Sequence, residues 1–358
     1  SQSQPDNKEI QDKVVDLKEK SGAYSDLEYY CDLYLRKRPD DPRLLNLRAV
    51  ALERSGRRDE AIEAYRALID KGVAEPRAYA NLAIQLFDKR LTDQAKIVLD
   101  KALEQHPDDG VIRAQRVRFF LHAQDIDSAQ TEIAEAVKQA PEVSEVLLMA
   151  LQVAIRKEDL ASAQQYGERL LAAHPEVPDA YTLLARVYAQ QGQPEKAIEL
   201  LSKADPYLQA DNIEIMVALF DLLLTVGRTD EARAVADSLA KAHPNNAIIQ
   251  DYLKARLALV DNNVKDAVTL LESVVVRMPT YSPAHIHLAV AYMQDGKKDQ
   301  ARQSLESYLR TTPDDQTAKT LLERISNPPK DVSTVLASAQ SMLASGATNQ
   351  AMLVAAAM

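Results

Sequence analysis

Small and large apolar residues recur along the chain at a fixed spacing. We number each unit so that a recurring alanine stands at position 20; the alanines, most of them 34 residues apart, are Ala61, Ala95, Ala129, Ala163, Ala197, Ala232, Ala267, Ala301 and Ala351. A second small residue usually stands at position 8, and a large apolar residue usually stands at position 11. Side-chain size sets the distance between packed helices. The pattern therefore predicts closely packed helical hairpins that repeat along the chain.

Glycine and proline mark the ends of these predicted helices. Six of the nine glycines stand at position 15, namely Gly22, Gly56, Gly192, Gly227, Gly296 and Gly346. Glycine adopts the left-handed conformation that ends a helix without a steric cost. Position 32 is proline in seven units, namely Pro39, Pro107, Pro141, Pro175, Pro244, Pro279 and Pro313. Proline has no N–H to donate, so it stops the second helix of each hairpin.

These features resemble the tetratricopeptide repeat. The clearest units are residues 76–107, which read PRAYANLAIQLFDKRLTDQAKIVLDKALEQHP, and residues 178–204. The tryptophan usual at position 4 is absent, and Leu45, Tyr79 and Tyr181 stand there. The resemblance covers about residues 8–313. It implies an all-α fold, a right-handed superhelical solenoid of about nine helix-turn-helix repeats followed by a detached C-terminal helical hairpin.

The register divides the chain into segments. We expect a disordered leader at 1–8, a degenerate N-terminal capping hairpin at 9–41 and eight repeats at 42–313. A capping helix at 314–326 then precedes a Pro-Pro break at 327–331, because a residue before proline disfavours the helical conformation. The polar leader is compatible with three origins. It could follow a removed signal peptide, follow a lipid-anchored cysteine, or consist of residues left by an expression vector.

The last segment, 332–358, contains no charged residue but keeps the repeat spacing through Ala339, Gly346 and Ala351. We expect a helical hairpin there, either a ninth repeat or a truncated one. A solvated hairpin normally carries charge on its outer face. Its surface is therefore expected to be covered by the same chain, by a second copy through self-association, or by sequence further downstream. A membrane-associated hairpin is the alternative.

Composition excludes several classes of function. The net charge is −10, which argues against general nucleic-acid binding because that needs a dense basic face. The chain has a single cysteine, Cys31, which cannot form an internal disulfide and is expected to be a buried thiol. No run of strongly apolar residues is long enough to predict a membrane-spanning helix.

The sequence shows no motif for catalysis, cofactors or metals. It lacks a Gly-rich phosphate loop, a dinucleotide fingerprint and an HExxH motif. His106, His174 and His243 each precede a position-32 proline, so they reflect the repeat, whereas His285 and His287 face different ways because they lie two residues apart. Acidic doublets at 40–41, 108–109 and 314–315 precede helix starts, where carboxylates cap free N–H groups.

The resemblance implies that the first helices of the pairs line a concave groove, with positions 2, 5, 9, 12 and 13 pointing inward. This predicts an apolar groove crossed by three arginines that either bind carboxylates of a partner or pair with neighbours such as Asp221 and Glu145. The predicted groove residues are Asn46, Asn81, Phe87, Arg118, Leu148, Gln152, Arg186, Asp221, Tyr252, Arg256, Ile286 and Met293.

One known function of the family is a clamp for the C-terminal carboxylate of chaperones. It needs lysine and asparagine on one first helix, asparagine on the next, and lysine and arginine on a third. In the units that begin at 42, 76 and 110, only Asn81 matches, whereas Val50, Val111 and Gln115 do not. The sequence therefore argues against this clamp.

The resemblance implies a non-catalytic scaffold that binds a protein or peptide segment, without a cofactor. We expect it to work in the bacterial periplasm or at a membrane, in an envelope assembly or export system. A cytoplasmic adaptor or co-chaperone is one alternative. The substrate-recognition arm of a larger enzyme, such as a glycosyltransferase, is another.

Overall fold

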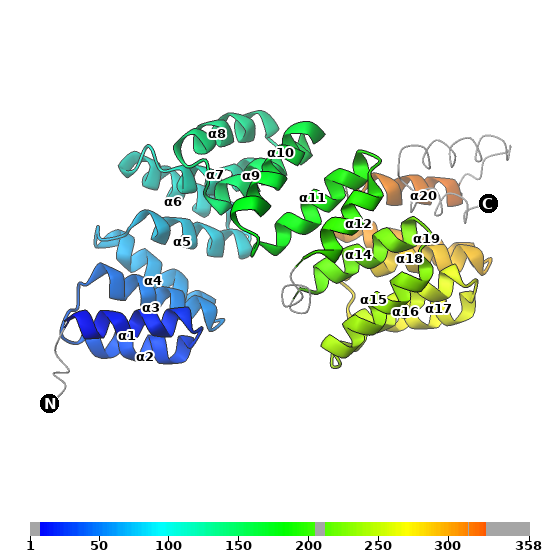
Figure 1. Cartoon of the computed structure of the whole chain (residues 1–358), viewed down its shortest axis with the longest axis horizontal. Helices are drawn as coiled ribbons and strands as arrows, with labels where there is room; N and C mark the ends of the chain where they lie inside the picture. The colour runs from blue at the N-terminus through cyan, green and yellow to red at the C-terminus, as the bar shows by residue number, and fades with distance from the viewer. Residues whose placement is uncertain (1–7, 205–211, 314, 327–358) are drawn as a thin grey trace. The chain divides into compact units, whose positions relative to one another are not determined.

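The structure is a computed structural model that describes residues 8–204, 212–313 and 315–326. In this part of the chain, nineteen helices follow one another in antiparallel pairs (Figure 1). The predicted all-α fold is therefore confirmed. The chain divides into two compact units, residues 1–173 and 174–358, and each is described by itself. The predicted leader up to Asn7, the Pro-Pro break and the hairpin at 332–358 lie outside the described residues.

Unit 1 contains five helical hairpins. In each pair the first helix packs on the second, and the second packs on the first helix of the next pair. The pairs are α1 (Lys8–Lys20) with α2 (Tyr24–Leu35), α3 (Pro42–Arg54) with α4 (Arg58–Asp70), α5 (Pro76–Asp88) with α6 (Thr92–Gln105), α7 (Gly110–His122) with α8 (Ile126–Gln139), and α9 (Ser144–Arg156) with α10 (Leu160–Ala173).

Unit 2 continues the same order of helices. Its pairs are α11 (Pro178–Gln190) with α12 (Pro194–Ser202), α14 (Ile213–Thr225) with α15 (Thr229–Ala242), α16 (Ala247–Val260) with α17 (Val264–Arg277), and α18 (Ser282–Gln294) with α19 (Lys298–Thr311). Helix α20 (Gln316–Ser326) packs on α19, inside the segment predicted to be a capping helix. Helix α12 has 9 residues, whereas the other second helices of this unit have 14.

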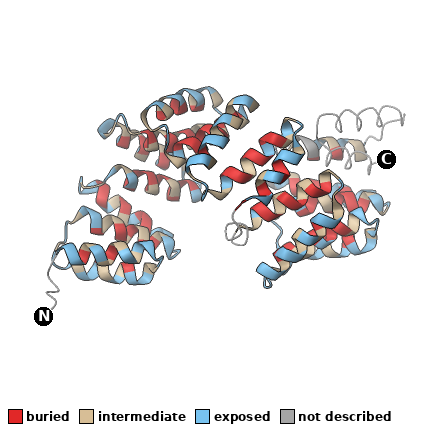
Figure 2. Ribbon diagram, viewed as in Figure 1, coloured by how far each residue is buried: buried red, intermediate tan, exposed pale blue. Residues whose placement is uncertain are grey.

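The repeating alanine is buried in every described hairpin. Its eight described members each have none of their surface exposed: Ala61, Ala95, Ala129, Ala163, Ala197, Ala232, Ala267 and Ala301. The alanines at position 8 are buried as well, for example Ala49 and Ala289. Burial is concentrated on the sides of the helices that face their neighbours (Figure 2). The small residues therefore lie where two helices approach each other, as the spacing predicts.

Position 15 takes the left-handed conformation in all nine described hairpins. Five of these residues are glycines with φ between 68° and 78°. The other four are Arg90, Gln124, Glu158 and Asn262, with φ between 58° and 60°. The backbone hydrogen bonds are the same in both groups: Arg57 donates to Leu52 after Gly56, and Leu91 donates to Leu86 after Arg90. The turn therefore forms even where the residue is not glycine.

The position-32 prolines end the second helices as predicted. The residue before the proline leaves the helical conformation, with φ between −123° and −139° at His106, Ala140, His243, Met278 and Thr312. The next first helix then begins with a side-chain cap in several repeats. The carboxylates of Asp41, Asp109 and Asp315 accept hydrogen bonds from the backbone N–H three residues on, at 3.2, 2.9 and 2.9 Å. The second residue of each acidic doublet is therefore structural.

Enlarging the buried alanines is expected to destabilise the hairpins. Ala129→Leu and Ala197→Leu each add three methylene-sized groups where no surface is exposed. Overpacking of this kind costs about 1–3 kcal/mol. Chemical denaturation measures the loss, with Ala67→Leu at an exposed position of α4 as the control. Unfolding midpoints that stay at the wild-type value in both core variants would contradict the repeat register.

Exchanging residues at position 15 is expected to change stability in opposite directions. Arg90→Gly removes the strain that a residue with a Cβ has in the left-handed conformation, which is about 1–2 kcal/mol. Glycine also has more conformational freedom in the unfolded chain, and this lowers stability by about 0.5–1 kcal/mol. We expect a net gain of about 0.5–1 kcal/mol in urea unfolding. Gly56→Arg, in the preceding hairpin, is expected to lose a similar amount. A loss of stability in Arg90→Gly would show that the arginine side chain stabilises the turn.

Candidate protein-binding face

The first helices of unit 2 carry a polar network at positions that the sequence predicts to face inward. We call the side chains at positions 2, 5, 9, 12 and 13 of the first helices the first-helix face. In unit 2 this face includes Asp221 on α14, Tyr252 and Arg256 on α16, and Ile286 and Met293 on α18. Asp221 and Arg256 share position 9 of consecutive repeats, so the repeat itself brings them together.

Arg256 is the centre of this network. Its guanidinium donates from one nitrogen to the Asp221 carboxylate at 2.6 Å and to the Tyr252 hydroxyl at 3.2 Å. Only 6% of the Arg256 side chain is exposed, whereas 35% of the Asp221 side chain is exposed. A buried guanidinium needs such partners, because an unpaired charge in the interior is strongly unfavourable. The exposed polar group of the pair is therefore the carboxylate.

Tyr252 extends the network to α18. Its hydroxyl lies 3.2 Å from His287 Nδ1, which is also 2.8 Å from the Pro283 carbonyl oxygen. Because a carbonyl can only accept, Nδ1 carries the hydrogen in this arrangement. The Tyr252 ring also packs edge-on against Tyr281, with ring centroids 5.1 Å apart. Arg256 thus joins α16 to α14, and Tyr252 joins α16 to α18.

Burial shifts the titration of these groups. It raises the pKa of the Tyr252 hydroxyl to about 12, and it also raises the pKa of Tyr281. Burial, followed by the positive charge of Arg256, holds the pKa of His287 well below 6.5. The ring of His287 is therefore neutral near neutral pH, and Arg256 is the only cation of this network among the described residues.

Half-buried apolar side chains flank the network. They are Val217 on α14, Leu259 on α16, and Ile286 and Met293 on α18. Each stands at position 5 or 12, on either side of the position-9 pair of Asp221 and Arg256. The face therefore combines apolar contact area with one exposed carboxylate, which is the composition expected of a protein-binding surface rather than of a catalytic centre.

The first-helix face of unit 1 is organised differently. Asn81 donates to the Tyr65 hydroxyl at 3.0 Å, and that hydroxyl donates to Glu53 at 2.9 Å. Phe87 stacks on His122 of α7, with ring centroids 6.0 Å apart and an interplanar angle of 13°. The first set of contacts joins α3, α4 and α5, and the second joins α5 and α7. They leave the predicted groove residues of unit 1 half-buried or, for Phe87, buried.

The three arginines of α7 have separate roles. Arg113 and Arg116 donate to the two oxygens of Glu132 on α8, at 2.9 and 2.7 Å, and only 8% of the Glu132 side chain is exposed. They therefore hold α7 to α8 and do not form part of the first-helix face. Arg118, at position 9, is half-buried on that face, beside the apolar side chains of Leu121 and Leu148 in the same core region.

The structure brings together only part of the predicted groove set. Asp221, Tyr252 and Arg256 form one network, so Arg256 has the intramolecular pairing with Asp221 that the sequence left open. Among the other predicted residues, Arg186 is exposed, and Asn46, Gln152, Ile286 and Met293 are half-buried. The sequence analysis missed His287 and Tyr281. His287 stands at position 6 of its repeat, as Asn81 does, and this shared position was the available signal.

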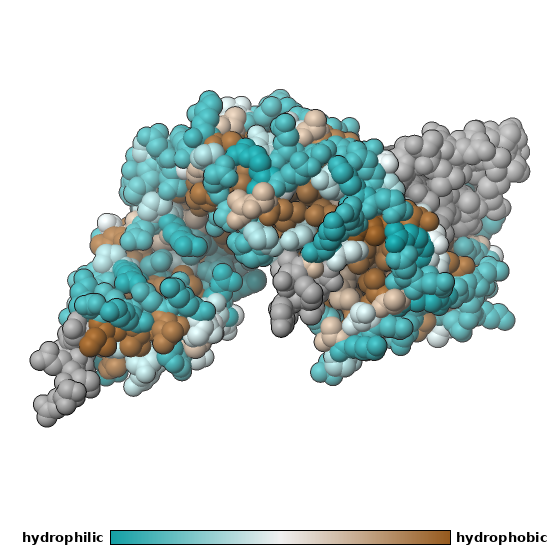
Figure 3. Space-filling view, viewed as in Figure 1, coloured by the Kyte–Doolittle hydropathy of each residue, from teal (hydrophilic) through white to brown (hydrophobic). Residues whose placement is uncertain are grey.

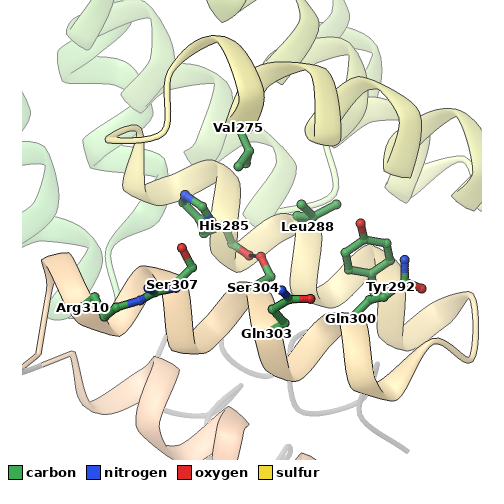
Figure 4. Close-up of a pocket in the computed structure, with 9 residues that line it drawn as sticks. All are labelled: Val275, His285, Leu288, Tyr292, Gln300, Gln303, Ser304, Ser307 and Arg310. Atoms are coloured by element: carbon green, nitrogen blue, oxygen red, sulfur yellow. Dashed lines mark hydrogen bonds between the residues drawn. The ribbon is translucent and has the colours of Figure 1, made fainter.

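A separate pocket of about 240 Å³ lies between α17, α18 and α19, on the second-helix side of unit 2 (Figure 4). Ser304 and Ser307 of α19 line it opposite Leu288, and Ser304 donates to the His285 carbonyl at 3.0 Å. The earlier repeats of this unit have leucine or valine where Ser304 stands, so the small side chain leaves the space. His285 lines this pocket whereas His287 contacts Tyr252, which confirms that the two histidines face different ways.

The described residues show neither a candidate metal site nor a membrane-spanning helix. They contain no group of three or more histidine, cysteine, aspartate or glutamate side chains that could hold a metal ion. In the same part of the chain, no helix combines the length and the apolar character needed to cross a membrane. Cys31 is buried, as predicted, and burial raises the pKa of its thiol to about 12.

Comparison with known families identifies the same type of repeat along most of the chain. A sequence profile described as Tetratricopeptide repeat matches residues 86–151, 154–211 and 258–325. A second profile with the same description matches residues 29–76, 46–110 and 217–277. The first profile alone covers more than half of the chain. No curated protein sequence matches this chain.

Solved structures show the same fold at low sequence identity. The chain resembles the Cut9–Hcn1 hetero-tetramer of APC/C, with a TM-score of 0.58 and 14% identity over 84% of this chain and 59% of that one. It resembles a tetratricopeptide repeat protein from Parabacteroides merdae, with a TM-score of 0.58 and 15% identity over 74% and 99%. It also resembles a human IFIT1 dimer with m7Gppp-AAAA, with a TM-score of 0.52 and 14% identity over 84% and 81%.

The network predicts that stability depends on pH through His287. Because its pKa is lower in the folded protein than in the unfolded chain, the unfolded chain binds more protons as the pH falls below 6.5. Stability is therefore lost as the pH falls from about 7 to about 5. The neighbouring charged and titratable groups are Arg256, Asp221, Tyr252 and Tyr281.

Replacing the histidine is expected to remove this contribution. In His287→Asn the melting temperature is expected to fall less between about pH 7 and pH 5 than it does in the wild type. Thermal unfolding followed by circular dichroism measures both slopes. Equal slopes in the two proteins would mean that His287 is not kept neutral by the fold.

Proposed function

The chain belongs to the tetratricopeptide repeat family, whose repeats form protein–protein interaction scaffolds, and from this premise we propose that it binds a peptide or protein segment through the first-helix face of unit 2. The single observation that carries the proposal is the network of Asp221, Arg256, Tyr252 and His287. It joins α14, α16 and α18, with Asp221, Arg256 and Tyr252 at inward positions, and is flanked by half-buried apolar side chains.

The network supplies rigidity to this face. A partner that binds to fixed side chains loses less conformational entropy on association than one that must first order them. Arg256 is held by two hydrogen bonds and packs within 5.9 Å of the rings of both Phe220 and Tyr252. Its role in binding is therefore to position Asp221 and Tyr252 rather than to contact the partner directly.

The exposed groups define the chemistry of the segment that fits. Val217, Leu259, Ile286 and Met293 offer apolar contact, and methionine adapts to partners of varied shape. The exposed side of the Asp221 carboxylate accepts hydrogen bonds from backbone N–H groups or from a basic side chain. We therefore expect a segment with apolar side chains and a donor group between them.

The sequence suggests a second kind of partner contact, made by single arginines at position 9. Arg118 in unit 1 and Arg186 in unit 2 stand at position 9 without the deep burial of Arg256, and they suit carboxylates of a partner. This interpretation predicts an acidic partner, whereas the network of unit 2 predicts an apolar segment with a donor group. The two interpretations are separated by substitution.

We propose a bacterial envelope assembly or export system as the setting, with the protein in the periplasm or at the membrane. The frequent use of this family in such systems supports the proposal. A cytoplasmic adaptor and the recognition arm of a larger enzyme are the alternatives; repeats of this family are typically non-catalytic. Fractionation of the native cells and the full reading frame distinguish the three.

Random peptides displayed on phage provide the test of binding. Selected peptides are expected to be rich in apolar residues, and their affinity is measured by fluorescence polarisation. In the double variant Ile286→Glu with Met293→Glu, affinity is expected to fall at least about tenfold, which corresponds to about 1.4 kcal/mol. Two apolar contacts with the bound segment are lost in this variant, and two negative charges are added to the first-helix face.

Matched variants locate the contact surface. Val276→Glu adds the same charge on α17, where 79% of the valine is exposed outside the first-helix face, and is expected to leave affinity unchanged. Arg118→Ala with Arg186→Ala tests the arginine interpretation. Affinity that survives the Ile286 and Met293 changes, but is lost with the two arginines, would place binding on the arginines instead.

A further inference from the structure

The N-terminal hairpin leaves an apolar surface uncovered. Ile10 and Leu17 on α1 are 47% and 65% exposed, and Leu33 on α2 is 39% exposed. Val14, between the first two on the same side of α1, is half-buried. Figure 3 shows hydrophobic surface over α1 and α2. We call Ile10, Val14 and Leu17 the end face.

The repeat register shows what this surface normally does. Ile10 and Leu17 stand at positions 3 and 10 of their hairpin. In the later hairpins of unit 1, position 3 has none of its surface exposed in Leu44, Ala78, Ile112 and Val146. Position 10 is buried in Ala51, Gln85 and Val153 and half-buried in Phe119. The second helix of the preceding hairpin packs on each of these first helices.

The end face is therefore a helix-packing surface without its usual partner in the described residues. A terminal repeat of a stack normally carries a polar outer face. The exposed side of α1 instead carries apolar residues at positions that are buried or half-buried in the later hairpins of unit 1. Exposed apolar patches of this kind mark interaction sites.

We propose that the end face binds the end face of a second copy of this chain, with the two α1 helices antiparallel about a two-fold axis. A two-fold contact uses the same patch on both partners, so the patch must be complementary to itself. Ile10 and Leu17 lie at the two ends of the apolar stripe. In the antiparallel arrangement Ile10 of each copy therefore meets Leu17 of the other, and the two Val14 side chains meet near the axis.

Charge on one edge of the stripe favours this direction. Glu9 and Lys20 lie three helical turns apart, so they project from the same side of α1 at its opposite ends. When the second helix runs antiparallel, Glu9 of each copy lies beside Lys20 of the other. A parallel arrangement would instead place like charges together. The 2.6 Å pair of Glu9 with Lys13 is fully solvated, so exchanging it for Lys20 costs little.

The size of the surface predicts a weak dimer. One helix face buries less than the roughly 1,200 Å² of typical stable complexes. The average mass of the full chain in sedimentation equilibrium is therefore expected to rise with concentration, from one copy towards two. This association is independent of the proposed binding through unit 2.

Substitution at the end face tests the proposal. Leu17→Glu places one charge at each end of the two-fold contact, opposite Ile10 of the other copy, and is expected to abolish the rise in mass. Because Leu17 is 65% exposed, the folded monomer is expected to keep its helicity in circular dichroism. Ile97→Glu is the matched control, since Ile97 on α6 is 67% exposed in the same unit but lies outside the end face. It is expected to associate as the wild type does.

A charge exchange tests the antiparallel direction. Lys20→Glu is expected to weaken association, and adding Glu9→Lys to it is expected to restore association. Failure of the double variant to recover would overturn the antiparallel geometry. Deleting residues 330–358 separates this contact from self-association through the uncharged C-terminal segment.

Three results would overturn the proposal as a whole. The first is a single-copy mass at every concentration. The second is association that persists in Leu17→Glu. The third is association that is lost on deletion of residues 330–358 but unaffected by the end-face changes.

Discussion

The close approach of two helices at one alanine is the contact on which the repeating structure depends. All eight described members of this series have no exposed surface, whereas their neighbours in the sequence vary freely. A larger side chain at this point would separate the helices and change how each hairpin presents its first helix. Gly110 shows the same constraint between α7 and α8, because a Cβ there would lie 2.7 Å from the Ala140 side chain. Small residues thus set the distances, and larger ones fill the remaining space.

The turn inside each hairpin shows that this packing is stronger than the local preference of the residue. Arginine, glutamine, glutamate and asparagine adopt at position 15 the same left-handed backbone that glycine adopts elsewhere. Asparagine tolerates this conformation better than the others. The burial of the two helices on each other compensates for a strain of about 1–2 kcal/mol per turn. The position is therefore dictated by the geometry of the hairpin, and glycine is its least strained occupant.

The sequence was most informative where one residue type has one physical effect. Proline at position 32 and alanine at position 20 located the helix ends and the helix contacts, because no other conformation suits those residues there. It was less informative about side chains that meet across repeats. The sequence left open whether Arg256 binds a partner or pairs with a neighbour. In the structure its partners are Asp221 of the preceding repeat and Tyr252, one turn earlier on α16. The pairing of Arg256 with Asp221 depends on how neighbouring helices pack, and the spacing of residues within one helix does not predict it.

The same reasoning explains why α12 and His287 escaped prediction. Helix α12 ends at Ser202 after 9 residues, whereas the other second helices of unit 2 have 14, and no proline marks this end in the sequence. His287 was set aside as a metal ligand because it lies two residues from His285 and the two side chains face different ways. Its neutral ring matters only through Arg256, which adds an unfavourable charge to the effect of burial. The pKa of His287 is thus lowered in part by an arginine of the neighbouring repeat, and the pattern of residues along the chain does not reveal this contact.

A stack of hairpins has two kinds of surface that remain for partners, and they differ in their physical origin. The first-helix face is made by repetition, so its contacts can change from repeat to repeat without disturbing the core. On the end face of α1, residues at positions that are buried between helices in the later hairpins are exposed. A polar network such as that of Arg256 costs stability when its partners are imperfect, whereas it fixes the positions of the groups around it. Its place on the first-helix face, rather than between second helices, is what associates it with binding.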